Sequence, residues 1–218
     1  MPPCASSACP ADAGFRRWHT SDKSASSRKC WDCNVPVDQR SPHFCGQCKK
    51  IQPPAPTANQ FQLLGIDPSF EVDERALEAR YKALQKELHP DKFSTASPEE
   101  RAFSDAQAAA VNAAYDTLRH PLRRARALLR LHGIEPAEGD RVEDPALLAY
   151  AMETREAVEE AETRPELEQL LAESRERQAE TTAALREACG KKDWPAAAEA
   201  TTRLRYIFRT QEAILDKM

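Results

Sequence analysis

Apolar side chains recur at helical spacing between residues 59 and 134. Four large ones stand at i, i+4, i+7 and i+11, which places them on one face of a helix: Leu77, Tyr81, Leu84 and Leu88. Pro90 ends that helix, because a proline pushes the residue before it out of the helical region. A polar stretch follows, after which the pattern predicts a second, returning helix.

The returning helix has a clear start signal. Ser97 and Pro98 predict its N-cap and first residue, and two glutamates follow at its positive end. We expect its buried face to consist of Phe103, Ala110, Val111, Ala114, Tyr115 and Leu118. A shorter helix over 122–132 should end at Gly133, since glycine accepts the left-handed backbone of a helix stop.

Residues 144–218 predict a bundle of three further helices. The first covers 145–161, and the breaks after it are short, at Arg164-Pro165 and at 190–193. Short connections favour antiparallel neighbours. The second helix repeats apolar and small residues near heptad spacing, at Leu167, Leu170, Leu171, Ser174, Gln178, Thr181, Leu185 and Ala188. The third does the same at Trp194, Ala198, Thr201, Leu204, Phe208, Gln211 and Leu215.

The first 58 residues lack this helical pattern. Three prolines predict a stiff linker over 51–58, because each fixes φ and removes a backbone donor. Residues 30–50 form a cysteine-rich module. Residues 1–29 are rich in Ser, Ala and Pro and carry five basic against two acidic side chains. That composition fits either an organellar transit peptide or a disordered tail.

Charge is unevenly spread along the chain. The net charge is −4, yet residues 119–130 carry five arginines and no acid, whereas 135–188 carry 16 acidic against 6 basic side chains. An acidic segment repels phosphate, so we expect no nucleic-acid surface there. No apolar run approaches the length of about 18 residues that a membrane span needs, and we expect no membrane insertion.

Two Cys-x-x-Cys pairs carry the clearest chemistry. Cys30 and Cys33 are followed, after eleven residues, by Cys45 and Cys48. Four thiolates at this spacing can close tetrahedrally around one structural Zn2+ and leave no open coordination position for catalysis. We expect Gly46 to supply the tight turn by adopting positive φ. An iron site or a redox dithiol are the competing interpretations.

A second motif is His89-Pro90-Asp91, which stands where one helix ends and a loop begins. Pro90 forces the chain out of the helix and leaves the flanking histidine and aspartate exposed on a rigid corner. Arg80, Lys82 and Lys86 belong to the polar face of the preceding helix. Taken alone, the tripeptide would be better explained as a helix stop beside a solvated charge run.

Residues 59–132 resemble a J-domain in three stretches: NQFQLLGID, ALEARYKALQKELHPDKF and VNAAYDTLRHPLRRARALLRLHG. The resemblance implies a helical hairpin for residues 59–134 whose corner docks on a DnaK-type chaperone and stimulates its ATP hydrolysis. His89, Pro90 and Asp91 would make that contact. The basic side chains of Arg80, Lys82 and Lys86 would support it electrostatically.

The segments LLAYAMETREAVEEAE and DWPAAAEATTRLRYI resemble HscB, the iron–sulfur co-chaperone, and the leading cysteine pairs resemble its animal-type, mitochondrial members. This implies that the bundle binds the iron–sulfur cluster scaffold protein through Leu148, Met152, Glu153, Glu156 and Tyr206. On pattern alone, Leu148 and Met152 would rather be core. Ala149 and Thr154 stand where larger apolar residues are usual, so we expect a smaller or shifted contact.

The resulting hypothesis is a co-chaperone and not an enzyme, located in the mitochondrial matrix, with the cytoplasm as the alternative. Self-association into a homodimer stays open. Three rivals remain: a zinc-ribbon nucleic-acid-binding protein, a dithiol oxidoreductase, and a J-domain protein with another client such as diphthamide synthesis. The first would use basic and aromatic residues near the cysteines, namely Arg28, Lys29, Trp31, Arg40, Lys49 and Lys50.

Overall fold

The computed structural model describes residues 28–38, 42–135 and 145–218. The segment that we interpreted as a transit peptide or tail lies almost entirely outside these residues. The described helices are α1 (Gln60–Leu64), α2 (Glu74–Leu88), the 3-10 turn η1 (Pro90–Phe93), α3 (Pro98–Arg119), α4 (Pro121–Leu131), α5 (Pro145–Glu160), α6 (Arg164–Lys191) and α7 (Trp194–Lys217). The all-α fold class is therefore confirmed.

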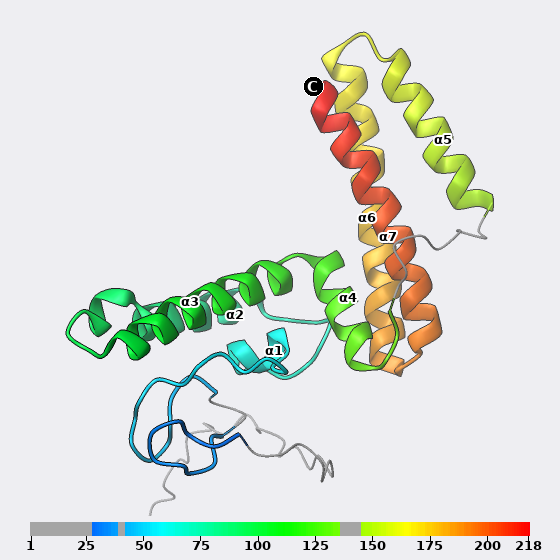
Figure 1. Cartoon of the computed structure of the whole chain (residues 1–218). Helices are drawn as coiled ribbons and strands as arrows, with labels where there is room; N and C mark the ends of the chain where they lie inside the picture. Colours follow the sequence, from blue (N-terminus) through cyan, green and yellow to red (C-terminus); the bar gives the residue numbers. More distant parts are fainter. Residues whose placement is uncertain (1–27, 39–41, 136–144) are drawn as a thin grey trace, which may run out of the picture.

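Figure 1 shows how these helices are arranged. The antiparallel pair α2–α3 projects to one side of the long hairpin formed by α6 and α7. Helix α4 lies at the junction and packs on α7, and α5 packs on the far half of the same hairpin. None of the described helices is long and apolar enough to cross a membrane.

The helix starts follow from capping residues in the sequence. Ser97 Oγ accepts the Glu100 N–H and the Glu100 side chain accepts the Ser97 N–H, which forms the capping box at α3. Asp73 caps α2 by accepting backbone N–H groups of its first turn. Asp193 does the same at α7 through the N–H of Ala196. Each cap satisfies donors that a helix start would otherwise leave unpaired.

The turn between α6 and α7 differs from our expectation. We placed the break at 190–193 with Gly190 as its first residue, but α6 runs through Gly190 to Lys191. The left-handed residue is Lys192, with φ 59°. The N–H of Asp193 bonds to the Ala188 carbonyl at 2.9 Å and closes the helix end. The glycine thus stands two residues before the position that needs it.

The hydrophobic core joins segments that we treated as separate domains. The inner faces of α1 to α4 form one cluster with the turn end of the α6–α7 hairpin, through Leu185, Ala188, Ala197, Ala200 and Leu204. His132 stacks on Trp194 across the same junction, with ring centroids 3.7 Å apart. A second cluster at the far end contains Val158, Leu167, Leu171 and Ile214. The segments 59–134 and 144–218 therefore share a core along their junction.

The stretch 51–58 is only partly the spacer that we expected. Ile51 and Gln52 are fully buried, and Ile51 belongs to the main helical core. The Gln52 carbonyl accepts a hydrogen bond from the side chain of Gln107 on α3, at 2.8 Å. We therefore define the cysteine module as residues 28–38 and 42–52, since its last two residues anchor it to the helices.

Candidate functional site

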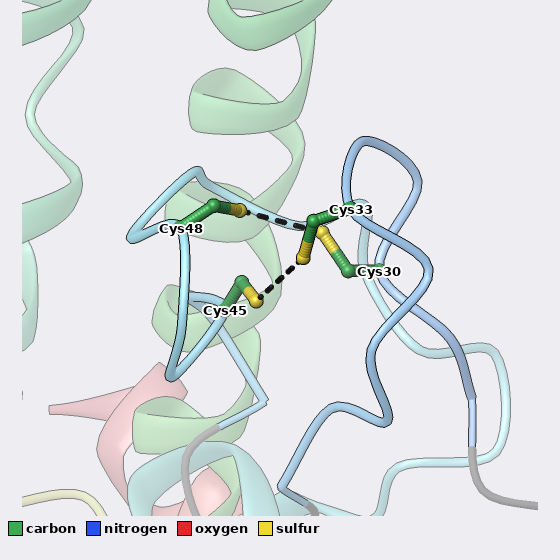
Figure 2. A group of neighbouring side chains, drawn as sticks. All are labelled: Cys30, Cys33, Cys45 and Cys48. Atoms are coloured by element: carbon green, nitrogen blue, oxygen red, sulfur yellow. Dashed lines mark hydrogen bonds between the residues drawn. The ribbon is translucent and has the colours of Figure 1, made fainter.

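The four cysteines of the module lie together in space (Figure 2). Their Sγ atoms all lie within 4.8 Å of one another, with 3.6 Å between Cys30 and Cys48 and 3.5 Å between Cys33 and Cys45. Isolated β-bridges Lys29–Pro36 and Phe44–Ile51 hold the two knuckles. The left-handed residues are Asn34 and Lys49, each directly after a second cysteine. The expectation of positive φ at Gly46 was wrong.

This donor set fits a four-coordinate metal ion. Tetrahedral Zn–S bonds of about 2.3 Å place sulfurs about 3.8 Å apart, close to the separations in this cluster. A disulfide would need about 2.05 Å, so the four cysteines are free thiols here. The backbone N–H of Asp32 and the side-chain N–H of Gln52 point to Cys30 Sγ at 3.4 and 3.3 Å, as donors that favour a thiolate.

The electrostatics of the cluster also favour a bound cation. Burial raises the pKa of Cys30, but hydrogen bonds from the backbones of Cys33 and Asp32 outweigh it and lower that pKa to about 6. For Cys48, the Lys50 backbone lowers the pKa, yet burial and the neighbouring thiols together raise it to about 12. The four sulfurs do not all ionise beside one another without positive charge. A dication would supply that charge.

Buried polar side chains tie the module to the helices. His43 is 3% exposed, and its ring nitrogens lie 2.8 Å from Gln107 Oε1 and 2.7 Å from the Leu63 carbonyl oxygen. Gln107 also donates to Gln52, which in turn donates to Cys30. The cysteine cluster is thus connected to α3 through hydrogen bonds of Gln52 and Gln107. Sequence spacing gives no signal for it, and we had not predicted Gln107 as buried.

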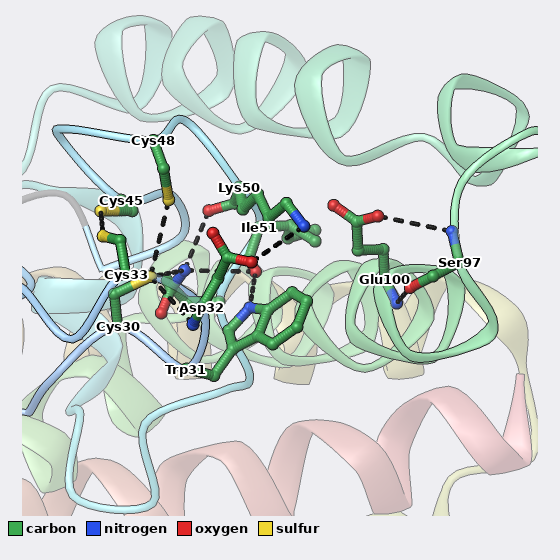
Figure 3. Close-up of polar contacts among 11 residues, drawn as sticks. Cys30, Trp31, Asp32, Cys33, Cys45, Cys48, Lys50, Ile51, Ser97 and Glu100 are labelled. Carbon is green, nitrogen blue, oxygen red and sulfur yellow. Dashed lines mark hydrogen bonds and ion pairs between the residues drawn. The ribbon is translucent and has the colours of Figure 1, made fainter.

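Trp31 packs between the cysteines and α3 (Figure 3). Its Nε1 donates to the Ile51 carbonyl at 2.7 Å, and its ring meets Phe103 edge-on with centroids 5.7 Å apart. Lys50 Nζ lies 5.0 Å from the Trp31 ring centroid and pairs with Asp32 at 3.1 Å. Trp31 and Lys50 are two of the side chains that a zinc-ribbon protein would use to contact nucleic acid. In this structure both make contacts within the chain.

The His89-Pro90-Asp91 corner, hereafter the corner, lies exposed where α2 ends and η1 begins, and Pro90 and Asp91 are the first residues of η1. The Asp91 N–H donates to His89 Nδ1 at 3.3 Å, and the Asp91 carboxylate lies 3.5 Å from the same nitrogen. These local contacts hold the histidine and aspartate side by side. The motif is therefore presented to solvent as a compact unit.

The three basic residues expected beside the corner do not share one surface. Lys82 and Lys86 are exposed one helical turn apart, and Lys82 pairs with Glu78 at 2.7 Å. Arg80 instead turns towards α1, where its Nε donates to the Leu64 carbonyl at 3.1 Å. The structure therefore brings together two of the three predicted residues. Arg80 lies on the other flank of α2.

The residues expected to meet a scaffold protein lie mostly on the outer face of α5. Leu148 is 40% exposed and Met152 65% exposed, so the interpretation of both as core is wrong. We call these two side chains the apolar patch. Glu153 and Glu156 are exposed on the same helix, and Tyr206 is half-buried on α7.

The inward face of α5 is formed by Leu147, Thr154 and Val158. Thr154 Oγ1 donates to the Tyr150 carbonyl at 2.7 Å. The small size of Thr154 therefore affects packing inside the bundle and not the outer surface of α5. Ala149, in contrast, lies on the exposed side of the helix.

Comparison with known proteins places the chain in a family. Residues 143–215 match the family described as HSCB C-terminal oligomerisation domain. The iron–sulfur cluster co-chaperone protein HscB of Mus musculus is 38% identical over 189 residues, which cover 85% of this chain and 81% of that protein. Its Homo sapiens counterpart is 37% identical, with 85% and 80% covered.

Solved structures agree with this assignment. The crystal structure of human co-chaperone protein HscB matches with a TM-score of 0.79 and 37% identity, covering 87% of this chain and 98% of that one. Chaperone HscB from Vibrio cholerae matches with a TM-score of 0.64 and 35% identity, covering 72% and 96%. From the fold, the cysteine centre and these matches together, the chain belongs to the HscB family of iron–sulfur cluster co-chaperone proteins.

Proposed function

We propose that this chain delivers an iron–sulfur cluster scaffold protein to a DnaK-type chaperone and stimulates chaperone ATP hydrolysis. The observation that supports this proposal is that the exposed corner and the apolar patch lie on separate arms of one molecule. Holding two partners on one body raises the effective concentration of the client at the chaperone. No bond is made or broken by this chain itself.

The corner provides the chaperone contact in this proposal. His89, Pro90 and Asp91 are exposed and preorganised by their own hydrogen bond, so little side-chain freedom is lost on docking. Lys82 and Lys86 present positive charge on the neighbouring turns of α2 and speed association with an acidic surface. Arg80 acts by holding α1 against α2.

The apolar patch provides the scaffold contact. Leu148 and Met152 are large apolar side chains left in solvent on α5, and exposed apolar groups rimmed by charge commonly mark binding surfaces. Glu153 and Glu156 form part of that charged rim, and Tyr206 on α7 contributes from the adjoining helix. Self-association through the same bundle is an alternative use of this surface.

The metal is proposed to be Zn2+ held by Cys30, Cys33, Cys45 and Cys48. Four sulfur ligands with no open position suit a structural role. The metal would supply folding energy to a module with almost no core of its own. The proposed compartment is the mitochondrial matrix, because the leading cysteine pairs resemble those of the animal-type, mitochondrial members of the family.

The test is a steady-state ATPase assay of a mitochondrial DnaK-type chaperone in the presence of the scaffold protein. The parent should stimulate hydrolysis, and His89→Gln should abolish stimulation while scaffold binding stays at the parental level. Thr95→Ala, an exposed change in the loop that follows η1, is the matched control. Equal activity of parent and His89→Gln would contradict the proposal.

A further inference from the structure

A buried hydroxyl closes the helix that leads into the corner. Ser104 on α3 is fully buried, and its Oγ donates to the carbonyl of Leu88 at 2.7 Å. Leu88 is the last residue of α2 and is itself fully buried. The contact spans 16 residues of sequence and ends one residue before His89. It is therefore a tertiary contact made at the base of the corner.

The Leu88 carbonyl needs this donor because of how the corner is built. In a continuing helix it would accept an N–H from three or four residues ahead. Those are the N–H groups of Asp91 and Lys92, which bond instead to His89 Nδ1 and to the His89 carbonyl. Pro90 has no N–H to offer. Since Leu88 is shielded from water, an unpaired carbonyl there would be costly.

The face of α3 that carries Ser104 also meets the cysteine module, because Ser104 lies four residues after Glu100 and three before Gln107. Glu100, Phe103 and Gln107 stand at i, i+3 and i+7 on one stripe of that helix, which meets the cysteine module. Gln107 contacts His43 and Gln52, and Phe103 contacts Trp31. In Figure 3, Trp31 and Lys50 lie between the cysteines and the first turn of α3. Adjoining positions on one face of α3 thus contact both the module and the end of α2.

We propose that Ser104 is a positioning residue for chaperone activation: it fixes the corner by pairing the Leu88 carbonyl, and the cysteine module holds α3 where Ser104 can do so. The inference rests on the proposed function, because it assigns a role in presenting the same corner. It adds a route by which the metal centre acts on the chaperone contact without touching the chaperone. Ser104 itself contacts neither partner in this mechanism.

The deciding experiment compares the parent with Ser104→Ala in two measurements on the full, metal-loaded chain. Loss of one buried hydrogen bond, about 1 kcal/mol, corresponds to about a fivefold change in an equilibrium constant. The concentration for half-maximal ATPase stimulation should therefore rise about fivefold while scaffold affinity is unchanged. Amide hydrogen exchange over residues 86–89 should quicken by a similar factor.

Two further variants separate the hydrogen bond from packing. Ser104→Cys keeps the shape but is a weak donor, so it should behave like Ser104→Ala. Thr117→Ala removes another hydroxyl of α3, one that bonds within its own helix to Ala113, and should behave like the parent. If Ser104→Cys stimulates and exchanges like the parent, space filling and not the hydroxyl matters, and the inference is overturned.

The outcomes also distinguish this inference from the proposed function. Faster exchange at the end of α2 with unchanged stimulation would overturn the positioning role and leave the corner as the chaperone contact. A parent that stimulates no better than His89→Gln would remove the proposed function and the inference with it. A higher concentration for half-maximal ATPase stimulation, together with weaker scaffold binding, would indicate general damage to the fold. That result would also count against the positioning role.

Discussion

At the scale of single residues, exposure decides which side chains are available to partners. Leu147 and Leu148 are neighbours of the same chemistry, yet Leu147 is buried in the bundle and Leu148 lies in solvent with Met152. An exposed methionine is flexible and polarisable, which suits a contact surface. Which apolar side chains α5 exposes to solvent therefore depends on a one-residue difference in register.

Met152→Lys tests this surface directly. The side chain is 65% exposed, so the change should shift the melting temperature by no more than about 2 °C, in keeping with surface substitutions of about ±0.5 kcal/mol. Scaffold binding should weaken at least about tenfold if Met152 is a central contact. Isothermal titration calorimetry measures it, with Glu160→Gln at the end of α5 as a control that changes the net charge by the same +1. Equal affinities for both variants would rule Met152 out as a contact.

His120 carries a second residue-scale prediction. Its ring packs on Phe208 with centroids 4.6 Å apart, and its Nδ1 is buried without a hydrogen-bond partner among the described residues. Burial lowers its pKa below 6.5, and the nearby cations of Arg123, Arg119 and Arg124 add to this against Glu212. The folded state therefore binds its proton less readily than the unfolded state.

The sign of the effect follows from linkage. A depressed pKa gives stability that is fully present above about pH 6.5 and is lost as the pH falls towards the folded-state pKa. Urea unfolding between pH 7.5 and 5.5 should show a steeper loss of stability for the parent than for His120→Asn. His89→Gln, which removes an exposed histidine, serves as the comparison. Parallel curves for the parent and His120→Asn would refute this role of His120.

At the scale of elements, backbone geometry sets where one helix ends and the next begins. The turn from α6 to α7 places a lysine in the left-handed region and leaves a glycine inside the helix. A Cβ added at Gly190 would meet nothing within 4 Å. The local sequence is thus poorly matched to its own turn, and the tertiary packing on either side imposes the geometry.

Exchanging the two residue types should stabilise the protein. Gly190→Ala replaces a glycine inside a helix, where glycine is about 1 kcal/mol less favourable than alanine. Lys192→Gly relieves a left-handed residue that costs roughly 1 kcal/mol. The double variant should gain about 1–2 kcal/mol in chemical unfolding, with chaperone stimulation unchanged. A loss of stability in Lys192→Gly would mean that the side chain of Lys192 has a role beyond the turn.

The cysteine module should depend on its metal. Chelation should lower the melting temperature of the whole chain and not only of the module, because His43, Gln107 and Trp31 connect the module to α1 and α3. Metal affinity should fall on acidification, since protons compete for the thiolates. Thermal unfolding measures the effect of chelation on the melting temperature. Metal content and thiol reactivity measure the effect of pH on metal affinity. Cys45→Ser should lose the metal and Cys189→Ser should keep it; metal retained by Cys45→Ser would contradict the ligand set.

At the scale of the whole molecule, one core unites the arm that carries the corner with the hairpin on which α5 and its apolar patch pack. Leu204 is fully buried where α7 meets the cluster of α1 to α4. A continuous core makes the two arms a single folding unit over that junction. This rigidity matters for the proposed function, because a fixed spacing between two contacts favours simultaneous binding of both partners.

Leu204→Ala should therefore lower stability by about 3 kcal/mol and reduce amide protection in α2–α3 and in α6–α7 together. Leu167→Ala is the matched change in the second cluster, at the far end of the bundle. Its loss of protection should concentrate in α5 and the start of α6. If Leu204→Ala left protection in α2 and α3 untouched, the arms would be independent domains.

The sequence by itself determined the features that depend on neighbouring residues. Ser97 and Pro90 set a helix start and a helix stop because capping and proline sterics act within a few residues. The two Cys-x-x-Cys pairs likewise predicted a metal cluster, since each pair needs only a local turn to aim two sulfurs together. These signals were sufficient for the fold class and for the four clustered cysteines.

Only the tertiary structure decided how those pieces meet. It placed Ser104, Gln107 and His43 in the interior, where polar groups are stable because partners far along the chain satisfy them. It left Leu148 and Met152 outside because Leu147 and Val158 already face the bundle. It also joined two apparent domains through Leu204. Periodicity shows that a helix has an apolar face, but the partner that covers that face is chosen by contacts between residues distant in sequence.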